Sequence, residues 1–489
     1  MYSGLSKQQL LGHLFSNAGI YGVAIVLTRI GGLLLLPLYW QKLEPADFGV
    51  IGLAQLVTMF LSPVLSLGLY DAVQRLFHEW SDEARPRHLA ALWSASLVLS
   101  AAICLSLYFL GRGLFDVLIS QVEFSPCIEL TIWIAFFSNL NLFPLTVMRA
   151  REELMRFAMV TIGMFATQAG SILLFLFVLG WKAEGYLAGM LVCGVLWGGY
   201  FIVFMLRECR FPWRWHHLAE PLRYSLPTVP ASIMEGVGSI FDRYFLDKSV
   251  ALGVIGLYNL GNQIGGTINS FNQILKASWV PLIIRVMSER DDGPTILGRF
   301  SLYYVAAMAV PSLAVALLAK ELIELFGIGR FSGVYPFIPW FVLIYYLQSV
   351  GTAMGRGLDL AKKTIFSPIV PLVGILANFI GMYLLVPAYG VWGAVAAFLI
   401  TTVARIGTQI GLGFLFYPRP LFLWPLLKVN LIALAFFLAG YYIDTGHLGW
   451  TLLAKSAWIA IAAGMIAWTA LDWEKAMALV RRFNGGRRT

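Results

Sequence analysis

Long apolar stretches, each about as long as a helix that crosses a lipid bilayer, follow one another along almost the whole chain. A crossing helix needs about 20 predominantly apolar residues. The pattern predicts fourteen such helices, near residues 13–40, 46–70, 88–110, 126–148, 156–180, 184–206, 222–247, 251–282, 299–319, 333–355, 364–386, 390–416, 421–441 and 448–471. The first stretch is too long for a signal peptide and lacks a small-residue cleavage site, so we interpret it as a retained first span. The predicted fold is an all-α polytopic membrane protein.

The composition supports this prediction and excludes other classes of protein. The 489 residues are 59% hydrophobic and only 12% charged, whereas an average soluble protein is roughly 45–50% apolar and about 25% charged. These values exclude a cytosolic globular enzyme, a disordered protein and a secreted disulfide scaffold. The four cysteines are scattered along the chain, and we interpret them as small hydrophobic residues.

The distribution of basic residues predicts which ends of the spans lie in the cytoplasm, because Lys and Arg are retained on that side of a membrane. With the N-terminus inside, 24 of the 35 Lys and Arg residues fall in cytoplasmic segments, seven fall on the opposite side and four fall inside spans. We therefore expect both termini in the cytoplasm. The net charge of +9 reflects this topology and an attraction to anionic lipid headgroups, rather than nucleic-acid binding.

Two short sequence matches indicate an internal repeat. Residues 48–53 (Phe-Gly-Val-Ile-Gly-Leu) open the second span and match residues 252–257 (Leu-Gly-Val-Ile-Gly-Leu), which open the eighth, at an offset of 204. Residues 185–188 and 393–396 match at the starts of the sixth and twelfth spans, at an offset of 208. Six spans per repeat is an even number, so both halves have the same orientation in the membrane. The expected organisation is an N-lobe over residues 1–210, a C-lobe over 211–416, and two accessory spans with a basic cytoplasmic tail over 417–489.

One face of the predicted eighth span is strongly polar. At about 100° per residue, six positions of this span fall within an arc of about 100°; they are Asn259, Asn262, Gly266, Asn269, Gln273 and Lys276. Such a face either lines a cavity or supplies hydrogen bonds between neighbouring helices, worth about 0.6 kcal/mol each. Six positions exceed what packing needs, which favours a cavity. The Gly261-x-x-x-Gly265 and Gly407-x-x-x-Gly411 motifs, by contrast, are expected to allow close helix packing.

Charged residues inside the spans are candidates for a binding site, because a charge at the bilayer centre costs about 2.5–3.5 kcal/mol and usually faces protein or water. Arg29 and Arg405 lie near the middle of spans in opposite halves, and Lys276 ends the polar stripe. A guanidinium group is planar, always charged and suited to phosphate. These three residues and Arg243 are our candidates for an anion site. Lys455 lies near the outer end of an accessory span and is expected to extend its ammonium group to the interface.

Two carboxylates of the predicted seventh span, Glu235 and Asp242, are candidates for ion coupling. Glu235 either pairs with one of the intramembrane cations or takes up a proton during transport. Asp242 is followed by Arg243, so the alternative for this pair is a salt bridge at the end of a helix. Pro227 and Pro230 will kink this span.

No motif points to catalysis, a metal ion or a cofactor. The phosphate-binding sequence G-x-x-x-x-G-K-[ST] does not occur, so ATP is not the expected direct source of energy. The His216–His217 pair lies on a cytoplasmic connector with no carboxylate or cysteine at ligand spacing, and we interpret it as interfacial. Every connector is short, so we expect no catalytic residues and no enzyme.

Several segments carry a family resemblance. They are residues 29–33 (Arg-Ile-Gly-Gly-Leu) and 43–50 (Leu-Glu-Pro-Ala-Asp-Phe-Gly-Val), residues 226–232 (Leu-Pro-Thr-Val-Pro-Ala-Ser), 241–245 (Phe-Asp-Arg-Tyr-Phe) and 253–259 (Gly-Val-Ile-Gly-Leu-Tyr-Asn), and residues 378–381 (Asn-Phe-Ile-Gly) and 385–394 (Leu-Val-Pro-Ala-Tyr-Gly-Val-Trp-Gly-Ala). In these segments the chain resembles the polysaccharide-transporter branch of the MOP superfamily, the Wzx-type oligosaccharide flippases. The resemblance covers roughly residues 10–416 and is most specific over 226–259.

The resemblance implies two six-helix lobes around a cationic central cavity, with alternating access driven by a proton or sodium gradient. Members of the family move undecaprenyl-pyrophosphate-linked oligosaccharides, such as O-antigen or exopolysaccharide units, from the cytoplasmic to the periplasmic leaflet of the bacterial inner membrane. Polysaccharide polymerases are expected partners. The candidate arginines suit a pyrophosphate, and the Asn and Gln amides suit sugar hydroxyl groups.

Three alternative functions remain open at this point. A lipid II flippase would have a similar sequence pattern. A MATE-type multidrug or ion antiporter would favour an acidic cavity, whereas the intramembrane charges here are mainly positive. A membrane polysaccharide polymerase or glycosyltransferase would need a longer extracytoplasmic loop than this chain has.

Overall fold

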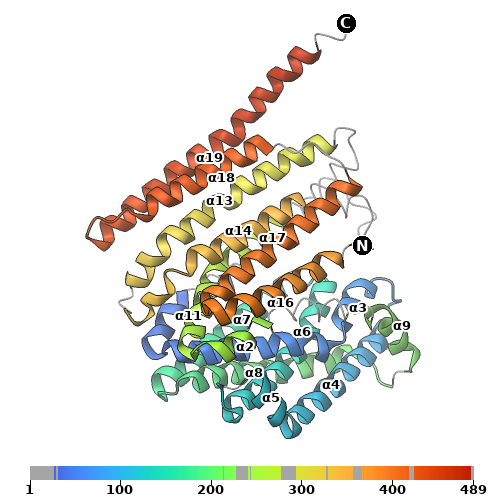
Figure 1. Cartoon of the computed structure of the whole chain (residues 1–489). Coiled ribbons are helices and arrows are strands. Elements are labelled where there is room, and N and C mark those ends of the chain that lie inside the picture. Colours follow the sequence, from blue (N-terminus) through green and yellow to red (C-terminus); the bar gives the residue numbers. More distant parts are fainter. Residues whose placement is uncertain are drawn as a thin grey trace. The chain divides into compact units, whose positions relative to one another are not determined.

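The computed structural model describes most of the chain as helices joined by short turns (Figure 1), with no β-strand among the described residues. The described residues are 27–28, 31–32, 34–119, 121–212, 214–226, 229, 241–242, 244–276, 293–325, 329–355, 366, 368–417 and 423–485. The predicted all-α fold is confirmed.

Eleven described helical segments are long and apolar enough to cross a membrane. They are Pro45–Ser66, Arg85–Leu110, Phe124–Ala150, Leu154–Val178, Ala183–Glu208, Ser301–Leu325, Phe331–Met354, Ile369–Tyr389, Val391–Phe416, Trp424–Tyr441 and Leu448–Ala470. Each coincides with one of the predicted spans. The three other predicted spans, at 13–40, 222–247 and 251–282, each include residues outside the described part of the chain. The chain is a multi-span membrane protein.

Two compact units make up the chain, Met1–Gly256 and Leu257–Thr489. The first unit extends beyond residue 210, because α9 (His216–Ser225) packs on α3 and α4, and Gln121 donates a side-chain hydrogen bond to the Val250 carbonyl (2.8 Å). The lobe boundaries at 210 and 416 were inferred from the sequence repeat and stay a prediction.

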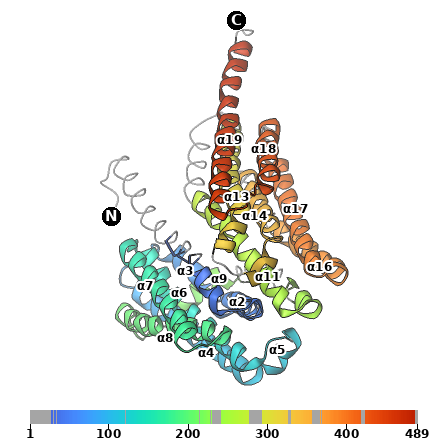
Figure 2. The ribbon, with the colours of Figure 1, turned by 90° about the vertical axis from the view of Figure 1, so that its left-hand side faces the viewer.

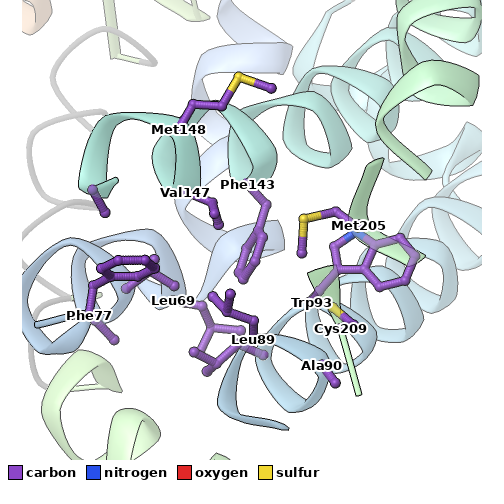
Figure 3. Packing of buried hydrophobic residues seen from close by; sticks show 14 of the residues in the cluster. Leu69, Phe77, Leu89, Ala90, Trp93, Phe143, Val147, Met148, Met205 and Cys209 are labelled. Atoms are coloured by element: carbon purple, nitrogen blue, oxygen red, sulfur yellow. The ribbon is translucent and has the colours of Figure 1, made fainter. Parts of the chain in front are cut away.

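In the first unit α6 is the central helix, since it packs against α2, α3, α4, α7 and α8. Phe143 and Val147 of α6 meet Leu89 and Trp93 of α4 and Met205 of α8 in a buried cluster (Figure 3). The helices of this unit are α2 (Pro45–Ser66), α3 (Leu69–Leu76), α4 (Arg85–Leu110), α5 (Arg112–Leu118), α6 (Glu129–Ala150), α7 (Leu154–Leu173), α8 (Ala183–Glu208) and α9. Short π-helical turns, Phe124–Ile128 and Leu174–Val178, extend α6 and α7.

In the second unit the last two helices pack against a long third one. Helices α18 and α19 contact each other and both contact α13 (Figure 2), while α16 and α17 form an adjacent pair joined at Gly390. The helices of this unit are α13 (Gly293–Leu325), α14 (Ile338–Met354), α16 (Ile369–Tyr389), α17 (Val391–Phe416), α18 (Leu423–Tyr441) and α19 (Leu448–Gly485). The accessory hairpin α18–α19 is therefore attached through α13.

Helix α11 (Leu252–Gly265) begins in the first unit and continues into the second. It is followed by a turn at Gly266 and a helical stretch over residues 267–276. The backbone amide of Asn269 donates to the backbone carbonyl of Gly266, three residues earlier (3.0 Å). The predicted eighth span is therefore interrupted by a turn at Gly266. Gly261 and Gly265 pack closely against the start of α14, because a methyl group on Gly265 would lie 2.5 Å from the Phe341 Cβ. The packing prediction is confirmed for this motif only, because Gly407 and Gly411 have no described neighbour within 4 Å.

Candidate functional site

The two repeated sequence motifs lie against each other where α2 and α11 begin. A methyl group on Gly49 would lie 2.5 Å from the Leu252 carbonyl oxygen, and one on Gly256 would overlap the Pro45 carbonyl. Helix α2 is set at this point by its N-terminus, where Pro45 occupies the first turn and the Glu44 amide donates to the Asp47 carboxylate (2.7 Å). The contact is therefore a close approach of backbones that only glycine permits.

The structure separates the polar stripe into partnered and unpartnered amides. The Tyr345 hydroxyl of α14 donates to the Asn262 side-chain oxygen (2.8 Å). Both amide atoms of Asn259 are buried and have no hydrogen-bond partner among the described residues. Asn269 is half-buried and Gln273 is exposed. Asn262 thus serves interhelical packing, while Asn259 retains unused hydrogen-bonding capacity.

A buried amide next to the stripe was missed by the sequence analysis. Asn272 is 4% exposed and accepts a hydrogen bond from the Tyr304 hydroxyl of α13 on its side-chain oxygen (2.6 Å). A similar pair lies in the first unit, where the Tyr70 hydroxyl donates to the Asn139 carbonyl (2.7 Å) and the Asn139 amide donates to Ser100 (2.6 Å). Only the tertiary neighbours identify these pairs, because each joins residues distant in the sequence.

Arg405 lies on α17 with an exposed side chain and no ion pair with a described residue. Its stem crosses α16 at Gly374, since a methyl group on this glycine would lie 2.6 Å from both Cγ and Cδ of Arg405. The bare backbone of Gly374 therefore leaves the space that the arginine stem occupies. The stem thus lies against the α16 backbone, and the guanidinium group has no carboxylate partner among the described residues.

The other candidate residues are only partly described. Lys276 is the last described residue of the helical stretch that starts at residue 267, is half-buried and has no ion pair with a described residue. Asp242 is helical and half-buried. Arg29, Arg243 and Glu235 lie outside the described residues, so their roles stay predictions.

The position of the Lys455 side chain contradicts the prediction that it extends to the membrane interface. Its side chain is 3% exposed rather than extended to the interface, and its ammonium group forms an ion pair with Glu321 of α13 and a hydrogen bond to the Leu317 carbonyl (3.3 Å). The prediction was wrong because the carboxylate partner lies on a helix more than a hundred residues earlier in the sequence.

The histidine pair, His216 and His217, opens α9 and contributes to packing within the first unit. His217 is 4% exposed and its carbonyl contacts the ring of His88 (2.9 Å), which stacks on Trp80. Burial lowers the pKa of His217 below its ordinary value, which favours the neutral ring. Among the described residues no group of three or more His, Cys, Asp or Glu side chains could hold a metal ion.

Comparison with protein families gives one match over more than half of the chain. The sequence profile of the family described as "Polysaccharide biosynthesis protein" matches residues 14–287. No curated protein sequence matches the chain.

Comparison with solved structures gives the fold. The chain is similar to "Lipid II flippase MurJ, inward closed conformation", with a TM-score of 0.74 and 14% identity over 94% of this chain and 99% of that one. It is also similar to an inward-facing multidrug resistance MATE family transporter of the MOP superfamily (TM-score 0.57, 15% identity, 85% and 96% covered). A third similar structure is a point mutant of the Vibrio cholerae MATE transporter VcmN (TM-score 0.59, 14% identity, 83% and 97% covered).

Proposed function

Because the chain belongs to the polysaccharide biosynthesis protein family and has the fold of MOP-superfamily transporters, we propose that it is a flippase for lipid-linked oligosaccharides. Its cargo is an undecaprenyl-pyrophosphate-linked oligosaccharide, which it moves from the cytoplasmic to the periplasmic leaflet for cell-surface polysaccharide export. It lies in the bacterial inner membrane with both termini in the cytoplasm, the orientation that the basic residues predict.

The observation that carries the proposal is an intramembrane arginine without a carboxylate partner among the described residues. Arg405 is exposed on α17, and its stem is held over Gly374. An unpaired cation within a span is costly, and a pyrophosphate offers the oxygens that a guanidinium group binds in a bidentate fashion. Arg29, Arg243 and Lys276 complete the proposed anion site.

The amides of the polar stripe supply the proposed sugar contacts. Leaving a buried donor or acceptor unpaired costs about 1–3 kcal/mol, and Asn259 has both amide atoms buried without a described partner. A sugar hydroxyl group both donates and accepts hydrogen bonds, so it can satisfy such an amide. Asn269 and Gln273 extend the proposed surface toward Lys276.

Alternating access requires contacts that close one side and then separate. The contact of Gly49 with Leu252 lies on the periplasmic side in the proposed orientation. Gly49 meets the carbonyl oxygen and the side chain of Leu252 there, and no ion pair between described residues crosses the contact. We propose that this contact closes the periplasmic side and that a proton or sodium gradient, acting through Glu235 and Asp242, drives its opening. Polysaccharide polymerases are the proposed partners that receive the product.

Translocation in proteoliposomes tests the proposal. A short-sugar prenyl pyrophosphate should appear in the outer leaflet only with the protein present, and faster with an imposed ion gradient. Lipid II in the same assay distinguishes the lipid II flippase from the proposed cargo. The absence of movement of any prenyl-pyrophosphate substrate, together with saturable drug efflux, would overturn the proposal in favour of a MATE-type antiporter.

A single added methyl group tests the proposed closing contact. Gly49→Ala should reduce translocation, because its methyl group would lie 2.5 Å from the Leu252 carbonyl oxygen and keep the two helix starts from closing. A matched control is Gly253→Ala at the start of α11, where a methyl group would meet no described atom within 4 Å, and this variant should transport normally. Full transport by Gly49→Ala would show that this contact is not needed during the cycle.

A further inference from the structure

A groove follows the line of contact between α7 and α8 of the first unit. Its volume is about 660 Å³, within the roughly 300–1,000 Å³ typical of small-molecule sites. The residues that shape it include Arg156, Met159 and Thr167 of α7 and Leu196, Trp197 and Tyr200 of α8. All of these residues lie in helical segments long and apolar enough to cross the membrane, so the groove opens along the depth of the bilayer.

Protein covers little of this part of the first unit. Only 17% of the apolar stretch in the α7 span is buried, the lowest share among the eleven described spans. Met159 and Leu196, on the two walls of the groove, are 61% and 59% exposed. In a membrane-spanning segment such apolar exposure means contact with acyl chains.

The α7 wall of the groove is about as long as one leaflet is deep. Arg156 and Thr167 are eleven residues apart on α7, which corresponds to about 17 Å at 1.5 Å per residue. Half of a hydrocarbon core of about 30 Å is about 15 Å. The α8 wall is shorter, since Leu196 and Tyr200 are four residues or about 6 Å apart, so only the α7 wall can follow an acyl chain over this depth.

A cation occupies the interfacial end of the groove. The Arg156 guanidinium donates to the Tyr200 hydroxyl (3.4 Å) and to the Glu153 carboxylate (3.2 Å), and lies 4.5 Å from the centroid of the Phe204 ring. The side chain is still 41% exposed, and a guanidinium group has five donors. Arg151 also lies 3.6 Å from Glu153 but forms a separate ion pair with Glu208, so two carboxylates face the two arginines. Donors of Arg156 remain for an anion at the headgroup level.

At the inner end of the groove the described polar atoms are paired with each other. The Trp197 indole N–H donates to the Thr167 hydroxyl (3.2 Å). The indole also rests on Gly163, where a methyl group would lie 2.8 Å from the ring. An occupant thus meets a charge at one end and hydrocarbon-like walls along the rest.

We propose that this groove binds an anionic phospholipid of the cytoplasmic leaflet, with its phosphate at Arg156 and one acyl chain along the line of contact between α7 and α8. The leaflet follows from the orientation used in the proposed function, and that leaflet carries the anionic lipids of the membrane. The lipid is distinct from the cargo, because the groove lies on the lipid-facing side of two helices of one unit. Binding is measured without transport, so its failure is separable from failure of the flippase proposal.

Native mass spectrometry of the delipidated full chain tests the headgroup. With matched acyl chains, phosphatidylglycerol should remain bound where phosphatidylcholine does not. Arg156→Gln should weaken phosphatidylglycerol retention by roughly tenfold, and Arg156→Lys should weaken it less. Arg207→Gln, on α8 but outside the groove, is the control and should have no effect. Equal retention of both lipids, or equal losses in Arg156→Gln and Arg207→Gln, would overturn the proposal.

The acyl chain and the competing ligands are tested in the same experiment. Leu196→Trp should fill the groove and release phosphatidylglycerol, while Leu206→Trp, an exposed leucine of the same helix outside the groove, should not. Excess inorganic phosphate should fail to displace the lipid, since the chain contributes to binding. Displacement by phosphate alone would indicate a free-anion site, and displacement by a prenyl pyrophosphate that depends on Arg156 would assign the groove to the cargo; either result would overturn the proposal.

Discussion

Lys455 and Arg405 are two cations inside membrane spans of the same unit, and the structure treats them in opposite ways. Lys455 of α19 is 3% exposed and is paired with Glu321, which is 4% exposed. Arg405 of α17 is exposed, and its stem lies over the bare backbone of Gly374. The first cation joins α19 to α13. The second is stabilised by no described carboxylate.

This difference separates a structural charge from an available one. A buried ion pair adds little net stability, but breaking it leaves one charge unpaired and costs much more. An exposed arginine without a partner costs little to remove, so its loss should affect binding rather than folding. Three predictions test whether the two cations differ in this way.

The largest effect is expected for Lys455→Met. This variant leaves the Glu321 carboxylate buried without its partner, so the free energy of unfolding should fall by about 3–5 kcal/mol. The midpoint of thermal unfolding in detergent micelles measures the change. The double variant Lys455→Met/Glu321→Leu should recover most of the stability, because it removes both charges.

Lys428→Met is the matched control for this experiment, since Lys428 is an exposed lysine of the neighbouring α18. It should leave the unfolding midpoint unchanged. If Lys455→Met proved as stable as Lys428→Met, the buried pair would not hold the accessory hairpin to α13.

An intermediate effect is expected for Arg405→Ala, and on transport rather than stability. Loss of charge-assisted hydrogen bonds to a phosphate costs about 1.5–3 kcal/mol, or roughly ten- to a hundredfold in apparent affinity. Translocation rates at several cargo concentrations, measured beside the unfolding midpoint, separate the two effects. Arg405→Lys should retain part of the activity. Normal transport by Arg405→Ala would remove this residue from the proposed anion site.

The smallest effect is expected for Gly374→Ala, which keeps Arg405 but moves it. The new methyl group would lie 2.6 Å from the Arg405 stem, so the side chain must change its conformation. A strained rotamer costs about 0.5–1.5 kcal/mol, which corresponds to roughly a two- to tenfold loss in apparent affinity. Gly407→Ala on the same helix as Arg405 meets no described atom within 4 Å and should transport normally. Identical behaviour of the two variants would show that the stem position does not matter.

The helical architecture could be predicted from the sequence because it depends on local hydrophobicity. Apolar stretches of sufficient length must be helical in a bilayer, since every backbone group needs an internal hydrogen bond. The predicted twelfth span at 390–416, for example, starts one residue before the observed helix Val391–Phe416. The break at Gly266 was not foreseen, although the Gly265–Gly266 pair marks a position where helix propensity is low.

The sequence could predict only which candidate residues share a helix face. Helical phase gives the direction of a side chain and not the residue that it contacts. Helical phase identified Asn259 and Asn262 as neighbours on one face, but it did not predict that Asn262 accepts a hydrogen bond from Tyr345. It could not find the bond between Tyr304 and Asn272, which depends on the packing of α13. The Glu321 partner of Lys455 was missed for the same reason.

The most direct test of the central claim compares two cargoes that differ only in charge. The same short oligosaccharide is attached to a prenyl pyrophosphate and to an uncharged prenol, and translocation of each is measured in identical proteoliposomes. The account predicts protein-dependent movement of the pyrophosphate only, and roughly tenfold or greater loss of that movement in Arg405→Ala. Equal movement of both cargoes, with no effect of Arg405→Ala, would contradict it.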